Sequence, residues 1–233
     1  VFSDAAGLVE TDEPLALSLQ GIGEVIEDYR QAALNARLAG FDGVELHCTS
    51  GYLPMQFMAS GSNQRSDAYG SDVTGRVRFA KEVIEAMASA IGAGRVGFRL
   101  CPGNPYNDID DRDPAGTAAA LCEAVAPLGL AYLHIMRSPL ADLDAFALAR
   151  RHSPHALILN DGFDGHSASA ALASGEGAAV SFGRHFIANP DLVERLKHGL
   201  PLSGFNRKTL YTPGRAGYSD YPTYQANAQE VAR

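Results

Sequence analysis

The sequence predicts an α/β fold in which about five βα units form part of an eight-stranded (β/α)8 TIM barrel. From residue 21 onward, amphipathic helical patterns and short apolar strands alternate with little chain between them, as is typical of parallel βαβ units. Polar residues follow the carboxyl ends of several different strands. A barrel builds its site from many strand ends, whereas an open doubly wound sheet uses one switch point, so we favour the barrel.

Each predicted helix combines apolar residues at helical spacing with a capping residue or a glycine stop. Helices are expected over residues 23–40, 74–91, 113–128, 140–152 and 167–174, with a last helix that begins at Pro190. Strands are expected over residues 43–47, 95–100, 131–136, 156–161 and 178–182. These elements form consecutive right-handed βα units.

Capping residues predict where three of these helices begin. Thr74 is the candidate cap of the second helix, and Asp113 with Pro114 opens the third. Asn189 is the candidate cap of the last helix, with Pro190 in its first position. Proline suits that position because the first turn of a helix does not use its backbone N–H groups.

The chain divides into three predicted parts. Residues 1–22 form an N-terminal segment, and residues 23–199 form the C-terminal part of the barrel. Residues 200–233 are rich in Gly, Pro and Tyr and show no clear period, which indicates a tail that packs on the barrel or frays at its end. No repeat of fixed length is found.

Composition and charge exclude several classes of protein. The 233 residues are 46% hydrophobic and 20% charged, which is typical of a globular protein. A net charge of -8 would repel a phosphate backbone, so we expect a small-molecule partner and no nucleic acid. No apolar run reaches the roughly 18 residues of a membrane span and no signal peptide is found, so we expect no membrane association and a cytoplasmic location.

The three cysteines Cys48, Cys101 and Cys122 show no CxxC or Cys/His metal spacing. An odd number of cysteines with this spacing argues against a disulfide scaffold and against a structural zinc ion. We therefore expect buried thiols or thiols close to the site, and no metal.

Candidate site residues gather at the predicted strand ends. His47, Ser50 and Tyr52 follow the first strand with a spacing that can direct them into one pocket. Further candidates at or beyond other strand ends are Arg99, Asn160, Gly162, Gly183 and Arg184. Without a ligand, His47 also fits a polar residue at a strand end whose hydrogen bonds are satisfied within the protein. Tyr52 also fits an amphipathic residue in the wall of a pocket.

The last two strands run into the segments NDGFDG and FGRHF, which suit a phosphate group. Glycine lets the backbone approach a ligand closely, and the loops after the last two strands of a TIM barrel commonly bind phosphate. The amides of Gly162, Phe163 and Arg184, with the Arg184 guanidinium, would then hold it. The alternative is that these glycines only serve turns.

Several ordered motifs resemble the C-terminal two-thirds of the old yellow enzyme family, which are flavin-dependent ene-reductases. The resemblance extends from about Gly23 to Pro222. Its motifs are GFDGVELHCTSGYLPMQFM, SNQRSDAYGSDVTGRVRFAKEVIEAM, VGFRLCP, FGRHFIANPDLVERLKHG and LYTPGRAGYSDYP. It implies FMN as cofactor, NADPH or NADH as reductant, and hydride transfer through the flavin to an activated alkene or nitro compound.

The resemblance also implies roles for individual residues. His47 would donate a hydrogen bond to the substrate oxygen, and Tyr52 would be the proton donor. Arg99 would lie beside the flavin pyrimidine ring, and Gly183 with Arg184 would bind the phosphate. Physically, a fixed imidazole stabilises an oxygen that becomes anionic, and tyrosine, with a reference pKa of about 10, keeps its proton at neutral pH.

The sequence departs from the family at several positions. Ser50 stands where the family usually has Asn or His as second donor to the substrate oxygen, and a serine is shorter. Asp161 would repel a phosphate unless it is turned away. A Tyr-Thr-Pro sequence at 211–213 replaces a glycine-rich stretch near the flavin edge.

The family's first three strands have no counterpart in this sequence, and five strands cannot close an eight-stranded barrel. We therefore expect part of a split, permuted or truncated enzyme, with a complementary N-terminal polypeptide that supplies those strands.

Two other functions fit parts of the sequence. A barrel enzyme acting on a sugar phosphate needs a lysine nucleophile or paired carboxylates at strand ends, but Lys81, Lys197 and Lys208 fall on predicted helices or in the tail. An inactive flavin-binding fragment or scaffold module is the second alternative. Yellow colour without turnover of an alkene would favour it.

Overall fold

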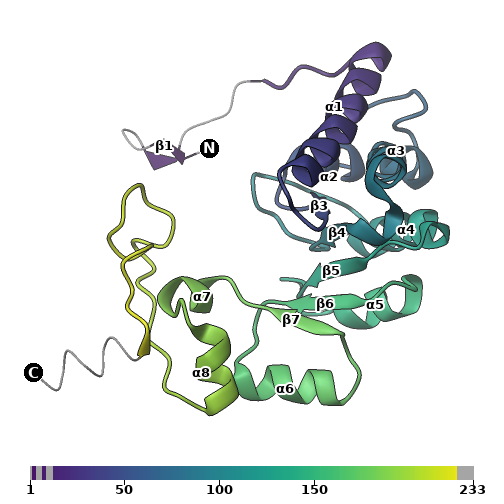
Figure 1. The fold of residues 1–233 in the computed structure, drawn as a ribbon. Coiled ribbons are helices and arrows are strands. Elements are labelled where there is room, and N and C mark those ends of the chain that lie inside the picture. The colour runs from purple at the N-terminus through teal and green to yellow at the C-terminus, as the bar shows by residue number, and fades with distance from the viewer. Residues whose placement is uncertain (1, 4–6, 9–12, 225–233) are drawn as a thin grey trace, which may run out of the picture. The chain divides into compact units, whose positions relative to one another are not determined.

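The computed structural model describes residues 2–3, 7–8 and 13–224, in which helices and strands alternate along the chain (Figure 1). The strands are β1 (Phe2–Ser3), β2 (Gly7–Leu8), β3 (Val44–His47), β4 (Val96–Leu100), β5 (Tyr132–Met136), β6 (Leu157–Asn160) and β7 (Ala179–Ser181). The helices are α1 (Leu19–Leu38), α2 (Leu53–Met58), α3 (Val73–Ile91), α4 (Pro114–Val125), α5 (Ala145–His152), α6 (Gly165–Ala173), α7 (Arg184–Ala188) and α8 (Leu192–His198), with 3-10 turns η1 (Ala93–Arg95) and η2 (Ala126–Leu128).

Strands β3 to β7 form one sheet in sequence order. Strands β3, β4 and β5 pair in parallel, as the alternation of strands and helices predicts. Each of the five observed strands lies inside its predicted range and is shorter than that range by one to two residues. The prediction of consecutive βα units is therefore confirmed.

The chain forms two compact units. Within the described residues, unit 1 comprises the chain up to Leu159 with Gly175–Ala179, and unit 2 comprises Asn160–Ser174 with the chain from Val180 onward. The ends of β3 and β4, with their candidate residues, belong to unit 1. The segments that follow β6 and β7 belong to unit 2.

The predicted helix starts are wrong at several places because a different residue is the cap. Helix α3 is capped by the Asp72 carboxylate, which accepts from the Gly75 amide, so Thr74 is already helical. Helix α5 begins at Ala145 instead of residue 140, because the Asp144 carboxylate accepts from the amides of Phe146 and Ala147 in the first turn. Helix α1 begins at Leu19, after the cap Ser18, four residues before its predicted start.

The last helix was predicted as one element opened by Asn189 and Pro190, and this is wrong. The chain instead forms α7 and α8, and Asn189 is the C-cap of α7. Its side chain is fully buried, where it donates to the His185 carbonyl and accepts from the Ser203 amide at 2.7 Å. Asn189 therefore ties the following segment to α7 and does not begin α8.

Helix α3 is the centre of the packing in unit 1. It packs against α1, α2 and α4, and its residues Phe79, Val83 and Ile84 have no exposed surface. The Phe57 ring of α2 stacks on Phe79 with 4.2 Å between ring centroids. Burial of this aromatic pair fixes α2, and with it Tyr52, the residue directly before the helix.

Helix α2 was not predicted, since six residues are too short to show a helical period. It forms because Pro54 lies in its first turn, and because Met55, Phe57 and Met58 are buried against the core. The turn before it contains Gly51 with a φ of +72°, a conformation that glycine adopts without cost.

In unit 2, the buried Arg195 side chain holds the segment that follows α8. Its guanidinium pairs with Asp191 at 2.7 Å and donates to the carbonyls of Pro201 at 3.0 Å and Pro222 at 3.1 Å. The Tyr224 amide also donates to Asp191. The tail is thus ordered as far as it is described, and its predicted frayed end lies outside the described residues.

All three cysteines are buried thiols outside any disulfide, as predicted. Burial raises the pKa of the Cys122 thiol to about 12, with a further contribution from Glu123, so it is protonated at neutral pH. In the described residues, no group of three or more His, Cys, Asp or Glu side chains could hold a metal ion. None of the described helices has the length and hydrophobicity needed to cross a bilayer.

We expect the fold to lose stability as the pH falls below about 6.5, the reference pKa of histidine, partly because of His155. This side chain is 9% exposed, its Nε2 atom has no partner in the described structure, and burial lowers its pKa. The unfolded chain therefore binds a proton that the folded chain resists, which favours unfolding in acid.

Urea denaturation of wild type and His155→Gln at pH 7.5 and 5.5 measures this effect. The variant should lose less stability between the two pH values than wild type does. The same substitution at exposed His198 is the control. Equal losses for wild type and His155→Gln would contradict the prediction.

Candidate active site

Three side chains at the same level of the sheet build the first part of the site. His47 is the last residue of β3 and lies in register with Arg99 on β4, which in turn lies in register with His134 on β5. In-register residues on neighbouring strands project to the same face. The resulting row combines two imidazoles and a guanidinium at the carboxyl end of the sheet.

A second row of in-register residues lies two residues earlier on the same strands. Its glycine leaves a space that a large side chain from the next strand fills. Glu45 on β3, Gly97 on β4 and Tyr132 on β5 are in register. A Cβ atom at Gly97 would lie 2.3 Å from the Tyr132 ring. Glycine therefore leaves room for the Tyr132 ring over β4, close enough to Glu45 for the two groups to affect each other's pKa.

Glu45 links the two rows electrostatically. Its carboxylate accepts from Nδ1 of His134 at 2.9 Å. Burial would raise the pKa of Glu45, but the hydrogen bonds from His134 and Tyr132 and the charge of Arg99 lower it overall, so Glu45 is ionised at neutral pH. Burial raises the pKa of Tyr132 to about 12, and the Glu45 charge adds to this.

The charge state of His47 follows from its neighbours. Burial lowers its pKa, and the charges of Arg99 and His134 lower it further, against an opposite effect of Glu45. The His47 imidazole is therefore neutral at pH 7 and donates through one N–H.

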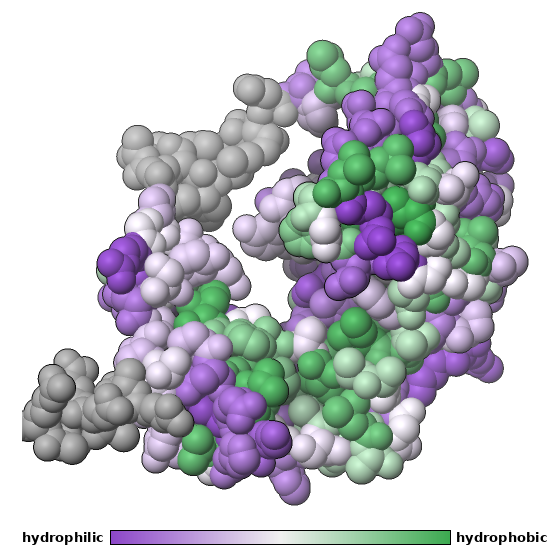
Figure 2. Space-filling model, viewed as in Figure 1, coloured by the Kyte–Doolittle hydropathy of each residue, from purple (hydrophilic) through white to green (hydrophobic). Residues whose placement is uncertain are grey.

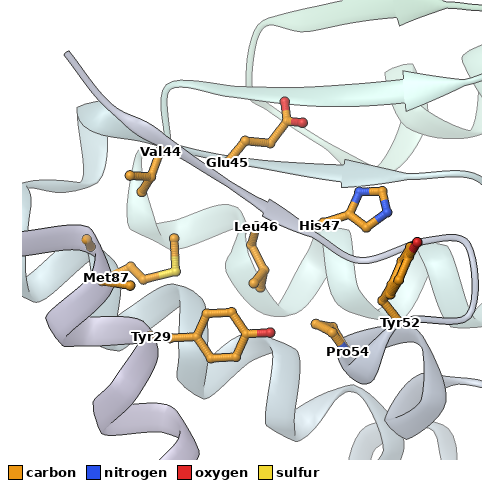
Figure 3. A pocket seen from close by; sticks show the side chains of 10 residues that line it. Tyr29, Val44, Glu45, Leu46, His47, Tyr52, Pro54 and Met87 are labelled. Atoms are coloured by element: carbon orange, nitrogen blue, oxygen red, sulfur yellow. The ribbon is translucent and has the colours of Figure 1, made fainter. Parts of the chain in front are cut away.

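Tyr52 lies beside His47 at the start of α2. The two ring centroids are 5.3 Å apart with an angle of 54° between the rings, and the tyrosine is 53% exposed. Figure 3 shows His47 and Glu45 on one side of β3, Leu46 on the other, and Tyr52 next to His47. A ligand that contacts one of these rings can therefore contact the other.

A pocket of about 370 Å³ runs along β3 to these two rings (Figure 3). It is lined by Tyr29, Ala32, Ala33, Val44, Glu45, Leu46, His47, Tyr52, Pro54 and Met87. Hydrophobic side chains also gather on the surface in the region of α1, α2 and β3 (Figure 2). The pocket is mostly apolar with a few polar side chains, namely Tyr29, Glu45, His47 and Tyr52, as in sites for small organic ligands.

Ser50 has a strained backbone and is held by the loop after β4. Its φ is +60°, which is rare for a residue other than glycine. The Asn107 side chain donates to its carbonyl at 2.8 Å, and the Asn104 side chain donates to its hydroxyl at 3.3 Å. The structure thus fixes Ser50 two residues before Tyr52.

Unit 2 contains the candidate phosphate site. Arg184 begins α7 and its guanidinium pairs with Asp161 at 3.0 Å, where both side chains are almost half exposed. Asp161 and Gly162 both have positive φ, and a Cβ at Gly183 would meet no atom within 4 Å. An exposed arginine beside open backbone fits a phosphate group, which would compete with Asp161 for the guanidinium.

The structure places the predicted residues in two groups. His47, Ser50, Tyr52 and Arg99 belong to unit 1, and Gly162, Phe163, Gly183 and Arg184 belong to unit 2. Sequence reasoning missed Glu45, Asn104, Tyr132 and His134. Glu45 could have been found, because it lies two residues before His47 and so projects to the same face of a strand.

The parallel sheet with alternating helices is part of a TIM barrel. The sequence matches the NADH:flavin oxidoreductase / NADH oxidase family over residues 2–203, and the chain belongs to this family. The fold class and the resemblance to old yellow enzymes are thereby confirmed, and FMN is the cofactor of the family.

Relatives support this assignment. A probable flavin mononucleotide-dependent alkene reductase of Leishmania infantum is 41% identical over 213 residues, which are 90% of this chain and 58% of that protein. Morphinone reductase in complex with tetrahydroNAD has a TM-score of 0.87 at 39% identity, covering 96% of this chain and 62% of the other.

The old yellow enzyme from Trypanosoma cruzi has a TM-score of 0.91 at 35% identity, covering 96% of this chain and 61% of that protein. The chain thus spans about three-fifths of the length of these relatives. What these relatives share with the chain is the fold and the family.

Proposed function

We propose that this chain carries the substrate-binding and proton-donating part of an FMN-dependent ene-reductase, which uses NADPH or NADH to reduce an activated alkene or nitro compound. The observation that carries the proposal is the pair of His47 and Tyr52 at the carboxyl end of β3, with 5.3 Å between ring centroids, beside the charge of Arg99. When bound, FMN would accept a hydride from the nicotinamide and pass it to the alkene.

His47 is proposed to bind the carbonyl or nitro oxygen of the substrate. This oxygen gains negative charge when hydride adds to the β-carbon, so a fixed N–H donor stabilises the transition state more than the ground state. The lowered pKa of His47 supports a neutral donor. Arg99, in register with His47, is proposed to lie beside the flavin pyrimidine ring, where its charge favours the anionic reduced form.

Tyr52 is proposed to deliver the proton that completes the reduction. Its hydroxyl can donate, and the ring is half exposed at the pocket, so substrate can reach it. Pro54 and the buried face of α2 fix its backbone. Transfer of this proton to the carbon next to the activating group leaves a saturated product.

Arg184 is proposed to bind the FMN phosphate together with the backbone of Gly162, Phe163 and Gly183. The guanidinium suits a phosphate because it can donate two parallel hydrogen bonds. The Asp161 carboxylate does not turn away from the proposed phosphate site, although its negative charge would repel a phosphate. Its ion pair with Arg184 balances the carboxylate and supports a site that exchanges Asp161 for phosphate.

We expect two substitutions in unit 2 to change the affinity for FMN in opposite directions. Arg184→Gln should raise the Kd by about 10- to 100-fold, since a charge-assisted hydrogen bond contributes about 1.5–3 kcal/mol. Asp161→Asn should lower the Kd several-fold, because it removes a negative charge that competes for Arg184.

Fluorescence titration with FMN measures both changes. Arg207→Gln is the matched control, because both guanidinium groups lie over the Phe205 ring. The guanidinium carbon is 5.9 Å from the ring centroid for Arg207 and 5.8 Å for Arg184. The control should bind FMN like wild type. An unchanged Kd in Arg184→Gln would refute the phosphate assignment.

The supply of further strands stays a prediction. Among the described strands of this sheet, β3 is an edge strand that pairs only with β4. A complementary polypeptide that pairs with β3 fits this arrangement. Size-exclusion chromatography that found a stable flavin-loaded monomer with full activity would rule out such a partner.

Alkene-dependent oxidation of NADPH or NADH by the flavin-loaded protein tests the proposed function. Mass spectrometry should find the saturated product in an amount equal to the nicotinamide consumed. A yellow protein without this turnover would instead be an inactive flavin-binding module. No described lysine lies at a strand end, so an aldolase-type sugar-phosphate enzyme has no support in the structure.

A further inference from the structure

The turn that carries Ser50 is held by a strained contact with the loop after β4. Of the five described non-glycine residues with positive φ, Ser50, Asn107 and Asp108 belong to this contact. A Cβ at Gly51 would lie 2.6 Å from Cβ of Asn107 and 2.8 Å from the Tyr106 carbonyl, so the loop rests directly on the turn. Such local strain is concentrated at functional sites.

The orientation of the Asn104 carboxamide is determined by its partners. Its Oδ1 accepts from the Tyr106 amide at 3.0 Å, so this end must be the oxygen. The other end is then Nδ2, which donates to Oγ of Ser50 at 3.3 Å and to Oγ1 of Thr49 at 3.4 Å. Asn104 therefore acts on Ser50 as a donor and not as an acceptor.

This direction decides what the Ser50 hydroxyl can do. A hydroxyl has one hydrogen to donate and two lone pairs that accept. Asn104 occupies a lone pair, and among the described residues the Ser50 hydroxyl donates no hydrogen bond of its own. The hydrogen is therefore available to a ligand, and donation by Asn104 polarises the O–H bond and strengthens it as a donor.

We propose that Asn104 is a positioning residue that makes Ser50 the second hydrogen-bond donor to the substrate oxygen, beside His47. This inference rests on the proposed function. Serine is shorter than asparagine or histidine at this position, so the pair leaves more room next to the oxygen. The chain should therefore accept a bulkier activating group, such as a nitro group or a substituted ketone, than a site with asparagine at position 50.

A double-mutant cycle on the flavin-loaded protein tests the proposal. Asn104→Asp has the same shape but offers Ser50 an acceptor, so the hydroxyl would turn toward it and away from the substrate. We expect Asn104→Asp and Ser50→Ala each to raise the KM for an activated alkene about tenfold, while flavin reduction by the nicotinamide is unchanged. The double variant should be no worse than Ser50→Ala.

Binding of a substituted phenolate gives a readout that is independent of turnover, because a phenolate presents a planar, delocalised oxyanion. Its Kd should rise in the same variants by a similar factor. Asparagine carries its own N–H donors, so the Ser50→Asn variant should bind the phenolate tightly. When Asn104→Asp is added to Ser50→Asn, the Kd should not change. Asn35→Asp, at an exposed position of α1 where the side chain only accepts from Gln31, controls for the added charge and should leave the Kd within about twofold of wild type.

Two results would overturn the inference. The first is an unchanged KM and Kd in Asn104→Asp, and the second is an effect of Asn104→Asp that persists in full when Ser50 is alanine. If wild type binds the phenolate with this pattern but reduces no alkene, the proposed function fails while the positioning role of Asn104 holds.

Discussion

Replacement of Tyr52 by phenylalanine is expected to slow reoxidation of the reduced flavin by an activated alkene by about 10²-fold or more, the usual contribution of a positioned general acid. Flavin reduction by NADPH or NADH should not change, because it needs no proton from this residue. The ring of phenylalanine keeps the contact with His47, so the variant removes only the hydroxyl. Anaerobic stopped-flow measurement of the two half-reactions separates the effects.

Tyr29→Phe is the matched control for this experiment. Tyr29 lines the same pocket from α1, so its variant removes a hydroxyl from the pocket without touching the His47 end. Its reoxidation rate should stay within about twofold of wild type. If Tyr52→Phe leaves the reoxidation rate unchanged, another group delivers the proton and the assignment of Tyr52 is wrong.

The second large effect is expected on stability, from Gly97→Ala. The added methyl group would lie 2.3 Å from the Tyr132 ring, so the ring or the strand must move inside a packed sheet. Overpacking of this kind costs about 1–3 kcal/mol of unfolding free energy. Displacement of Tyr132 also changes the surroundings of Glu45, one of the charges that act on the pKa of His47.

Two variants make this prediction specific. Gly94→Ala, in η1, meets no atom within 4 Å, so it should be neutral or slightly stabilising. In a Tyr132→Ala background, Gly97→Ala should cost much less, because the ring that it would meet is gone. Urea denaturation gives all the values. An equal cost with and without the Tyr132 ring would show that the close approach is not the cause.

The sequence predicts strands well in this protein because each strand is a short apolar run between helices with a clear period. The helix starts are harder to predict, since several residues near each start can accept a backbone N–H. Thr74 and Asp72 both can, and the structure selects Asp72. Likewise Asn189 has a capping residue type, but its buried bonds to His185 and Ser203 assign it to the end of α7.

The site is predictable in part. His47, Tyr52 and Arg99 follow from strand ends and from the family motifs. The link between Glu45 and His134 joins residues 89 positions apart, so it depends on the register of three strands. The ion pair of Asp161 with Arg184 and the bond from Asn104 to Ser50 also join distant segments. Such contacts cannot be predicted from local patterns.

The most direct test of the central claim is a single anaerobic titration. The purified protein loaded with FMN is bleached with NADPH or NADH, and an activated alkene such as a cyclic enone is then added while flavin absorbance is recorded. The account predicts that the absorbance returns without oxygen, in an amount equal to the alkene reduced. Flavin that stays bleached after the enone is added would contradict the assignment of this chain to an ene-reductase.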